Sequence, residues 1–335
     1  MAMPVGIDDV ARAAGVSTAT VSRALRGLPD VRESTRKRVE EAAVRLGYAP
    51  TPSAVSLASG RTRTIGLLTP WVSRWFHSNA IEGACQALRL AGFDALLYSF
   101  QLEHDATRTP IDLDVLRRRV DGVLVVGMTM TASEVALLES LGVPLVYVGS
   151  GPPEQVRVHV DDVATARLAT QHLLDLGHTR IGHIGGYPEQ RTPWATEVCR
   201  ARGYRDAMRA AGLPDDPDLL AYGRFERDGG RRAAVELLER VGDLTAIVAD
   251  SDEMAFGALE VLRERGVTVP GRVSVVGVDG HELGDLIGLT TVAQDAVALG
   301  GAAAGLMLEM ITGAPVDRDV VFPVELVRRA STRRH

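Results

Sequence analysis

From Ile65 onward, short runs of apolar residues alternate with segments of helical periodicity. The apolar runs include "TIGLLTP", "DGVLVVG", "VPLVYVG", "LTAIVAD" and "VSVVGVD", with helical segments such as 79–91, 163–176 and 254–265 between them. Strands that are apolar at nearly every position are buried on both faces, and helical connections of this length join parallel strands. Because this alternation occurs about twice, the sequence predicts two similar α/β lobes, each a doubly wound parallel sheet.

The first 48 residues follow a different pattern, that of three short amphipathic helices. Apolar residues at positions 7, 10, 11 and 14 share one helical face and are followed by Gly15, a suitable C-cap. Ser17 is a good N-cap for a second helix, and residues 33–48 have the pattern of a third. A helix, a glycine turn and a second helix at this spacing predict a helix-turn-helix head.

Charge is distributed unevenly between this head and the rest of the chain. Residues 1–63 carry a net charge of +4, whereas residues 64–335 carry −10. A basic head on an acidic body indicates that the head alone contacts a polyanion.

The second helix of the head, within "GVSTATVSRAL", has the composition of a DNA recognition helix. Thr18 and Ala19 are small enough to let its amino end enter a major groove, and Arg23 can donate two hydrogen bonds to a guanine edge. The predicted phosphate contacts are Ser17, Thr20, Ser22, Arg32, Thr35 and Tyr48. The alternative is a surface helix whose hydroxyl groups only cap and solvate it.

Residues 49–63, "APTPSAVSLASGRTR", are too polar for a core element and too few for a domain. The sequence therefore predicts a linker here, with one or two helical turns that present Ala54 and Leu57 on one side. The expected domains are a head at 1–48, a linker at 49–63 and a body at 64–335.

Seven segments, in family order over nearly the whole chain, resemble the lactose-repressor (LacI/GalR) family of transcription regulators. They are "DDVARAAGVSTATVSRAL", "RVEEAAVRLGYAP", "GRTRTIGLL", "LLDLGHTRIGHIGG", "ADSDEMAFGAL", "VSVVGVDG" and "LTTVAQD". The resemblance implies a sequence-specific DNA-binding regulator, most often a repressor of carbohydrate-metabolism genes, controlled by a small sugar-like effector. It also implies a homodimer that binds a near-palindromic operator in double-stranded DNA, with no cofactor.

The resemblance gives the linker a role in DNA binding. In the family, a hinge helix forms on the operator and a leucine wedges into the minor groove, which here corresponds to Leu57 preceded by Ala54. Pro52 departs from the family pattern but is tolerated in a first helical turn. Gly6 stands where the family has threonine or serine, so one phosphate contact is weakened.

The body resembles a sugar-binding protein fold, in which three crossovers join two lobes around a ligand cleft. The implied N-lobe spans about 64–162 and 294–323, and the C-lobe about 163–293 and 324–335. Family positions that contact the effector correspond to Trp75, Phe76, Asp161, Arg200, Phe225, Ser251, Asp279 and Gln294.

Carboxylates and an arginine in a partly dry cleft bind hydroxyl groups by charge-assisted hydrogen bonds, and aromatic rings stack on a sugar's C–H face. The alternatives are that Asp161 and Asp279 cap helices, that Arg200 is solvated and that Trp75 is a core or dimer contact. Ser251, where asparagine is common in the family, indicates an effector that differs from the usual monosaccharide.

Two other classes of protein fit the sequence less well. An enzyme would need a motif that the chain lacks: "GHIGG" is no G-x-G-x-x-G loop, no G-x-S-x-G elbow occurs, and the eight histidines have no metal-ligand spacing. A secreted sugar-binding protein would need an export signal and no head. We expect a cytoplasmic bacterial protein, on the nucleoid when bound to its operator, with no membrane contact. No leucine heptad follows the last strand, so we expect no tetramer.

Overall fold

The computed structural model describes residues 5–25, 28–48, 61–99, 111–187 and 192–335. The chain divides into two compact units, Met1–Thr62 and Arg63–His335.

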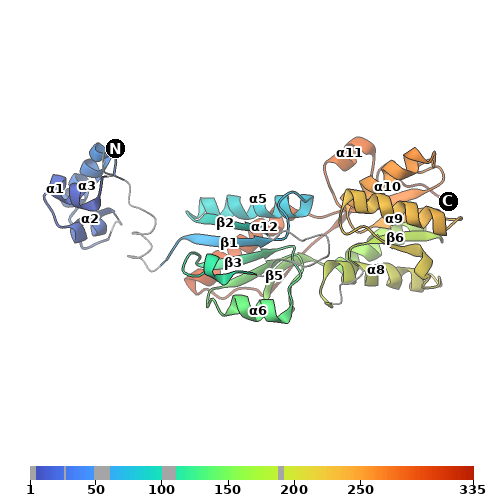
Figure 1. Ribbon diagram of the computed structural model, residues 1–335, viewed down its shortest axis with the longest axis horizontal. Helices are drawn as coiled ribbons and strands as arrows, with labels where there is room; N and C mark the ends of the chain where they lie inside the picture. The colour runs from blue at the N-terminus through green and yellow to red at the C-terminus, as the bar shows by residue number, and fades with distance from the viewer. Residues whose placement is uncertain (1–4, 26–27, 49–60, 100–110, 188–191) are drawn as a thin grey trace. The chain divides into compact units, whose positions relative to one another are not determined.

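In the described part of the first unit the chain forms helices α1 (Ile7–Ala14), α2 (Thr18–Leu25) and α3 (Glu33–Leu46) (Figure 1). Their apolar faces meet in a small core in which Val10, Val21 and Val39 have no exposed surface. Gly15 ends α1 with φ 63°, a left-handed conformation in which glycine has no steric penalty. The head therefore has the predicted helix-turn-helix arrangement.

The N-lobe of the second unit is a parallel six-stranded sheet in the order β11-β5-β4-β3-β1-β2. Helices α5 (Trp75–Leu90) and α12 (Ala296–Thr312) pack on one face, and α6 (Ala132–Glu139) packs on the other (Figure 1). The strands are β1 (Thr64–Thr69), β2 (Asp94–Ser99), β3 (Gly122–Val126), β4 (Leu145–Val148), β5 (Val156–Val160) and β11 (Asp319–Phe322), with a 3-10 turn η1 (Leu113–Val115) before β3.

The C-lobe is a second six-stranded sheet in the order β12-β10-β9-β8-β6-β7, parallel except for the β10–β12 pair. Its strands are β6 (Ile181–Gly185), β7 (Leu220–Tyr222), β8 (Ala246–Ala249), β9 (Ser274–Asp279), β10 (Thr290–Ala293) and β12 (Glu325–Val327). The covering elements are α7 (Asp162–Asp175), α8 (Thr196–Ala210), η2 (Pro217–Leu219), α9 (Arg227–Arg240), α10 (Asp252–Glu264) and α11 (Leu283–Ile287).

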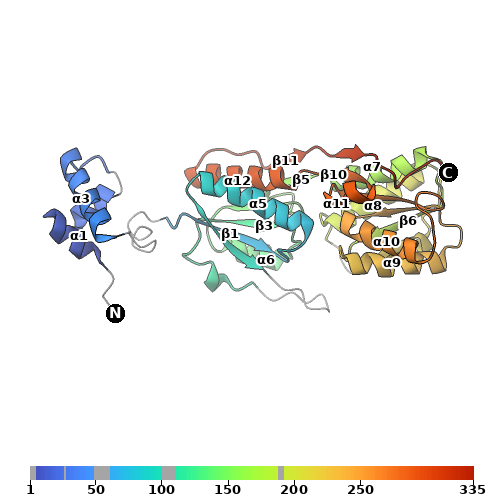
Figure 2. The ribbon, with the colours of Figure 1, turned by 90° about the horizontal axis from the view of Figure 1, so that it is seen from above.

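The chain passes between the lobes three times: from β5 to α7, from β10 to α12 and from β11 to β12. Figure 2 shows α5 and α12 side by side over the N-lobe sheet, although more than 200 residues separate them in the sequence. This architecture confirms the predicted fold class, two doubly wound lobes with a helical head.

Several elements differ from the sequence-based expectation, which named no strand at β5 or β11 and no helix at α11. Helix α5 begins at Trp75 rather than near residue 79, because the aromatic residues of its first turn pack toward the other lobe and the cleft. The antiparallel pairing of β12 with β10 was not predicted, because it joins two segments that are more than 30 residues apart in the sequence. Among the described residues, no helix is long and apolar enough to span a membrane.

Candidate DNA-binding helix and effector cleft

Helix α2 buries Val21 and Ala24 against the head and leaves the predicted base-reading residues, Thr18, Ala19 and Arg23, exposed. The Arg23 side chain is 54% exposed, and its Nε lies 3.6 Å from the Asp30 carboxylate. An exposed ion pair of this length is weak, so the guanidinium remains available to an outside partner.

The predicted phosphate-contacting residues differ in exposure. Ser17 and Arg32 are exposed, whereas Thr20, Ser22, Thr35 and Tyr48 are half-buried. Ser17 caps α2 as predicted, because its Oγ accepts a hydrogen bond from the Thr20 backbone N–H at 3.2 Å. Ala54 and Leu57, the predicted minor-groove pair, lie outside the described residues.

The two lobes enclose a cavity of about 490 Å³ at the carboxyl ends of their parallel strands. Ligands of doubly wound sheets bind here because the loops that follow the strands converge at this edge. Six of the eight predicted effector-contacting residues line the cavity: Phe76, Arg200, Phe225, Ser251, Asp279 and Gln294.

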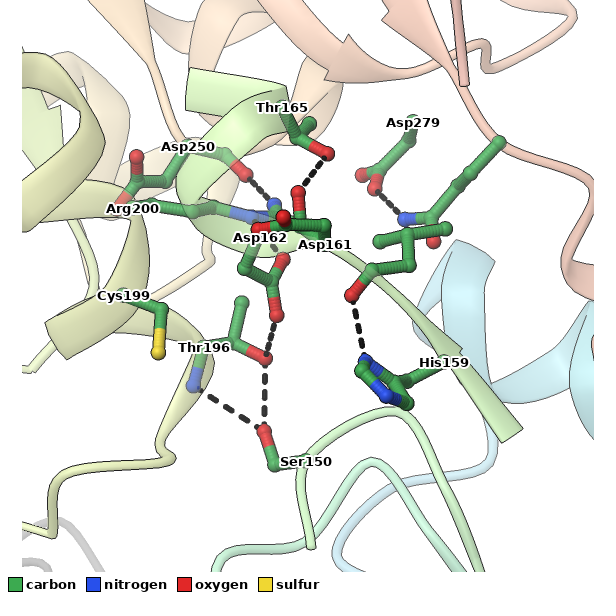
Figure 3. A network of polar contacts seen from close by, with 12 residues as sticks. Ser150, His159, Asp161, Asp162, Thr165, Thr196, Cys199, Arg200, Asp250 and Asp279 are labelled. Atoms are coloured by element: carbon green, nitrogen blue, oxygen red, sulfur yellow. Dashed lines mark hydrogen bonds and ion pairs between the residues drawn. The ribbon is translucent and has the colours of Figure 1, made fainter. Parts of the chain in front are cut away.

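Arg200 is the centre of a buried polar network that crosses the cleft (Figure 3). Its side chain projects from α8, and its Nε donates to Asp162 at 2.8 Å while Nη1 donates to the Asp250 carbonyl oxygen. Asp162 also accepts from the Thr196 hydroxyl at 3.1 Å, and that hydroxyl lies 2.7 Å from Ser150 of the N-lobe. Removing one partner of such a buried pair typically costs about 3–5 kcal/mol, so the network holds the guanidinium firmly against the cavity.

A second buried pair lies beneath Arg200. His183, on β6, is hydrogen-bonded to the Asp250 carboxylate at 2.8 Å, and neither side chain has exposed surface. The His183 ring also stacks on Tyr204, with centroids 4.7 Å apart. The "GHIGG" segment thus places its histidine in the core beneath the cleft.

Asp279 and Gln294 occupy neighbouring strand ends at the base of the cavity. Gln294 Nε2 donates to Asp279 Oδ1 at 2.8 Å. Burial raises the pKa of Asp279 to about 7, although Arg200 and the Gln294 hydrogen bond act in the opposite direction. The Asp279 backbone has φ 130°, a value that side-chain-bearing residues rarely adopt, and such strain is often found at binding sites.

Phe225 enters the cavity from a strained loop. Arg224 and Phe225 both have φ 55°, in the left-handed region. The Phe225 ring packs where Gly186 has no side chain, since a Cβ there would lie 2.4 Å from the ring. Tyr187 stands beside it, with ring centroids 6.2 Å apart. This close fit fixes the ring against the cleft.

Trp75 and Asp161, also predicted to contact the effector, do not line the cavity. The Trp75 ring turns to the C-lobe surface, stacks near His281 and donates from Nε1 to Glu282 at 2.6 Å. Asp161 is the N-cap of α7, where its Oδ1 accepts from the Ala164 backbone N–H at 2.9 Å, so it is a helix cap.

Most of the lining residues were not predicted, among them Trp71, Arg74, Asp162, Tyr187 and Glu197. Two of them had usable signals. Asp162 follows Asp161 directly, and when the first aspartate caps α7 the second is free to face Arg200. Glu197 precedes Arg200 by three residues, so the two share a face of α8.

Direct contacts between the lobes adjoin the cavity. Arg74, at the start of α5, donates to the Phe225 carbonyl oxygen at 2.7 Å and to Glu226 at 2.8 Å. Its guanidinium also lies over the Trp71 ring, 5.1 Å from the centroid. Trp71 and Tyr187, from opposite lobes, have nearly parallel rings with centroids 6.5 Å apart. The cavity is therefore bounded by groups whose distances depend on the angle between the lobes.

Comparison with known proteins agrees with this architecture. Residues 6–51 match the model of bacterial regulatory proteins of the lacI family, and residues 170–332 match a periplasmic binding protein-like domain. Catabolite control protein A of Priestia megaterium is 32% identical over 336 residues, which covers 99% of this chain and 100% of that protein.

Two solved structures are similar over almost the whole chain. A complex of the transcriptional regulator CelR with cellobiose is 33% identical with a TM-score of 0.72, and the match covers 98% of this chain and 99% of that one. A lac repressor dimer bound to operator and the anti-inducer ONPF is 25% identical with a TM-score of 0.85, covering 99% and 100%. The chain belongs to the lacI family of bacterial regulatory proteins and is a DNA-binding transcription regulator, not an enzyme.

Proposed function

We propose that this regulator represses carbohydrate-metabolism genes and that a sugar-like effector in the inter-lobe cleft controls its affinity for a near-palindromic operator. The observation that carries the proposal is the cavity, which is lined by buried polar groups and aromatic rings from both lobes. A ligand that contacts both lobes changes the free energy of the angle between them. The CelR complex with cellobiose and the operator-bound lac repressor dimer support this assignment.

The proposed mechanism begins at Arg200. Hydroxyl groups of the effector hydrogen-bond to Arg200, Asp279 and Gln294, which lie at the base of the cavity in fixed positions. Because Arg200 is joined through Asp162 and Thr196 to Ser150 of the N-lobe, ligand contacts also affect the bonds between the lobes. Two chains pair through their bodies, and the effector shifts this dimer toward a state with lower operator affinity.

On DNA, one α2 helix of the dimer enters the major groove of each half-site. Thr18, Ala19 and Arg23 contact base edges, and the surrounding hydroxyl groups and Arg32 contact phosphates. Leu57, preceded by Ala54, wedges into the central minor groove. Acting on chromosomal operators, the protein works in the bacterial cytoplasm and is on the nucleoid when bound.

Selection from a random duplex pool at near-physiological salt tests the DNA-binding part of the proposal. We expect enrichment of a palindrome of about one and a half to two helical turns with a flexible central step. If no sequence is enriched, with or without sugars present, operator recognition is contradicted.

The selected site then tests effector control through the release of labelled operator by a panel of sugars. Arg200→Lys keeps the buried charge but loses the forked donor geometry, so it should weaken the effector response about tenfold or more and leave operator binding intact. A normal response in this variant would remove Arg200 from the effector site.

A further inference from the structure

More acidic than basic side chains line the cavity. Five carboxylates line it, from Glu134, Asp162, Glu197, Glu253 and Asp279, against the two arginines Arg74 and Arg200. His77 adds no positive charge, because burial lowers its pKa to about 4. Low-dielectric walls strengthen the effect of such an imbalance on a bound ligand.

Both arginines already have carboxylate partners. Arg200 is 2.8 Å from Asp162, and Arg74 is 2.8 Å from Glu226. An anionic ligand would have to compete with these carboxylates or leave them without a partner in a buried site. Either outcome is unfavourable, so the cavity disfavours phosphate and carboxylate groups.

Among the lining carboxylates, Glu197 is the one whose negative charge is least offset by neighbouring hydrogen-bond donors and cations. It lies in the first turn of α8, where both Glu197 and the Phe225 ring approach Gly186: a Cβ on the glycine would be 2.7 Å from Glu197 Cβ and 2.4 Å from the ring. Within the described part of the chain, the only hydrogen-bond donor recorded for its carboxylate is its own backbone N–H. Glu197 is half-buried and lines the cavity, so a ligand in the cleft can supply the hydrogen-bond donor that its carboxylate lacks within the protein.

Burial raises the pKa of Glu197 to about 7, and the negative charges of Asp250 and Asp162 add to this rise. The Glu197 backbone N–H and the Arg200 guanidinium lower this pKa but do not offset the rise. A cation placed against this carboxylate would favour its ionised form, and a hydroxyl group would do so less strongly.

We propose that Glu197 is a specificity-determining residue and that the effector is an amine-bearing saccharide whose ammonium group binds the Glu197 carboxylate. The hydroxyl groups of the same ligand bind Arg200, three residues along the same helix face. This inference rests on the proposed function, since it identifies the class of effector for the cleft described above.

The test is calorimetric titration of the full-length protein with matched sets of sugars. In three sets the members share one ring and differ from the parent sugar in one group: glucose, glucosamine and glucose 6-phosphate, and the galactose and mannose equivalents. A fourth set compares cellobiose with its diamino counterpart. In a set that binds, the amine should bind at least about tenfold more tightly than the hydroxyl form, the equivalent of one pKa unit at Glu197. The phosphate should not bind.

Two variants assign the preference to Glu197. Glu197→Gln keeps the shape and removes the charge, so it should reduce the ratio of amine to hydroxyl affinity to about twofold. Glu236→Gln is the matched control on the exposed surface of α9 and should retain the full preference. Thermal melting of both variants checks that the body is folded.

Three results would overturn the inference: equal affinity for amine and hydroxyl forms, binding of a phosphorylated sugar, or a full amine preference in Glu197→Gln. A different result separates it from the proposed function. If no sugar in any form binds or releases operator, the sugar-controlled cleft itself is contradicted, whereas hydroxyl sugars that bind and release operator without amine preference contradict the role of Glu197 alone.

Discussion

Arg23 and Arg200 show how the surroundings of one residue type set its role. Arg23 is 54% exposed beside a carboxylate 3.6 Å away, whereas Arg200 is 4% exposed and hydrogen-bonded to Asp162 and to the backbone of Asp250. The first guanidinium retains freedom to adjust to a base edge. The second is held in place before a ligand arrives, which reduces the entropy lost on binding.

Replacing Arg23 by alanine should reduce operator affinity by about 1–3 kcal/mol and relax the preference at the base that it contacts. The dependence of nonspecific binding on salt should change little, because phosphate contacts remain. Competition between operator and random duplex over a range of salt concentrations measures both effects. Arg12→Ala, an exposed arginine on α1 with an ion pair to Asp9, serves as the control and should keep the sequence preference. Unchanged base preference in Arg23→Ala would exclude it from base reading.

Glu197→Gln should make stability less dependent on pH. Burial raises the Glu197 pKa to about 7 from a usual 4.5, so between these values the folded state binds more protons than the unfolded state. Stability therefore falls as pH rises through this window, by about 2–3 kcal/mol for this group. Glutamine does not titrate, so the free energy of unfolding of the variant, relative to that of the parent protein, should rise between pH 5 and pH 8. Urea unfolding at pH 5 and at pH 8 measures the difference in free energy of unfolding between the variant and the parent protein. The same difference at both pH values would contradict the prediction.

At the scale of elements, pairs of helices approach closely at glycines. In the α5–α12 pair, a Cβ at Gly300 would lie 1.9 Å from the Ala80 carbonyl oxygen, and a Cβ at Gly83 would lie 1.9 Å from that of Val297. These contacts bring α5, which carries Arg74 and Trp75 at its beginning, into a fixed position on the N-lobe. The position of Arg74 and Trp75 beside the cleft therefore depends on the packing of α5 against α12.

Gly300→Ala should accordingly destabilise the body by about 1–3 kcal/mol or more, because the added methyl group meets backbone that cannot move independently. Gly305→Ala, on the same helix, meets nothing within 4 Å and should stabilise by about 0.5–1 kcal/mol. If the helices approach closely at Gly300, thermal and urea unfolding should show a loss of stability in Gly300→Ala and a gain in Gly305→Ala. Destabilisation of the same size at both positions would indicate that any such substitution in α12 destabilises the body, independently of the contact with Ala80.

The local pattern predicts elements better than it predicts which side chains meet. Apolar runs and helical periodicity indicated both sheets, and the resemblance to the lactose-repressor family assigned Arg200, Asp279 and Gln294 to the cleft. The choice between Asp161 and Asp162, or between Trp71 and Trp75, depends on where a helix begins and how one lobe faces the other. Both depend on tertiary structure, so the sequence could not distinguish which of two nearby residues of the same type lines the cleft. Glu197 had a helical-spacing signal, but its isolation from donors depends on the packing of Phe225 and Gly186.

For the body as a whole, the contacts between lobes set the balance between open and closed clefts. N-lobe residues at the start of α5 meet C-lobe carboxylates: Arg74 pairs with Glu226, and Trp75 Nε1 donates to Glu282. The Trp75 backbone N–H also lowers the pKa of Glu253, which burial raises. Carboxylates at a helix N-terminus are favourable, so these contacts support closure even before a ligand contributes.

Arg74→Met removes two of these hydrogen bonds while keeping the apolar length of the side chain over Trp71. Because a ligand in the cleft binds the closed state better, this variant should weaken effector binding about 5–30-fold and speed effector release. Tryptophan fluorescence in stopped flow, with the effector identified by operator release, measures both. Arg89→Met, exposed at the other end of α5, is the control and should behave as the parent protein.

The same variant tests the direction of allosteric control. If the closed state has lower operator affinity, as proposed, then loss of the Arg74 contacts moves free protein toward the operator-binding state, and operator affinity without effector should rise. A fall in operator affinity together with weaker effector binding would show that closure favours DNA, and the effector would then be a corepressor. Unchanged values for both ligands would mean that the Arg74 contacts do not influence lobe closure, and the link from cleft to head would have to run through the Arg200 network alone.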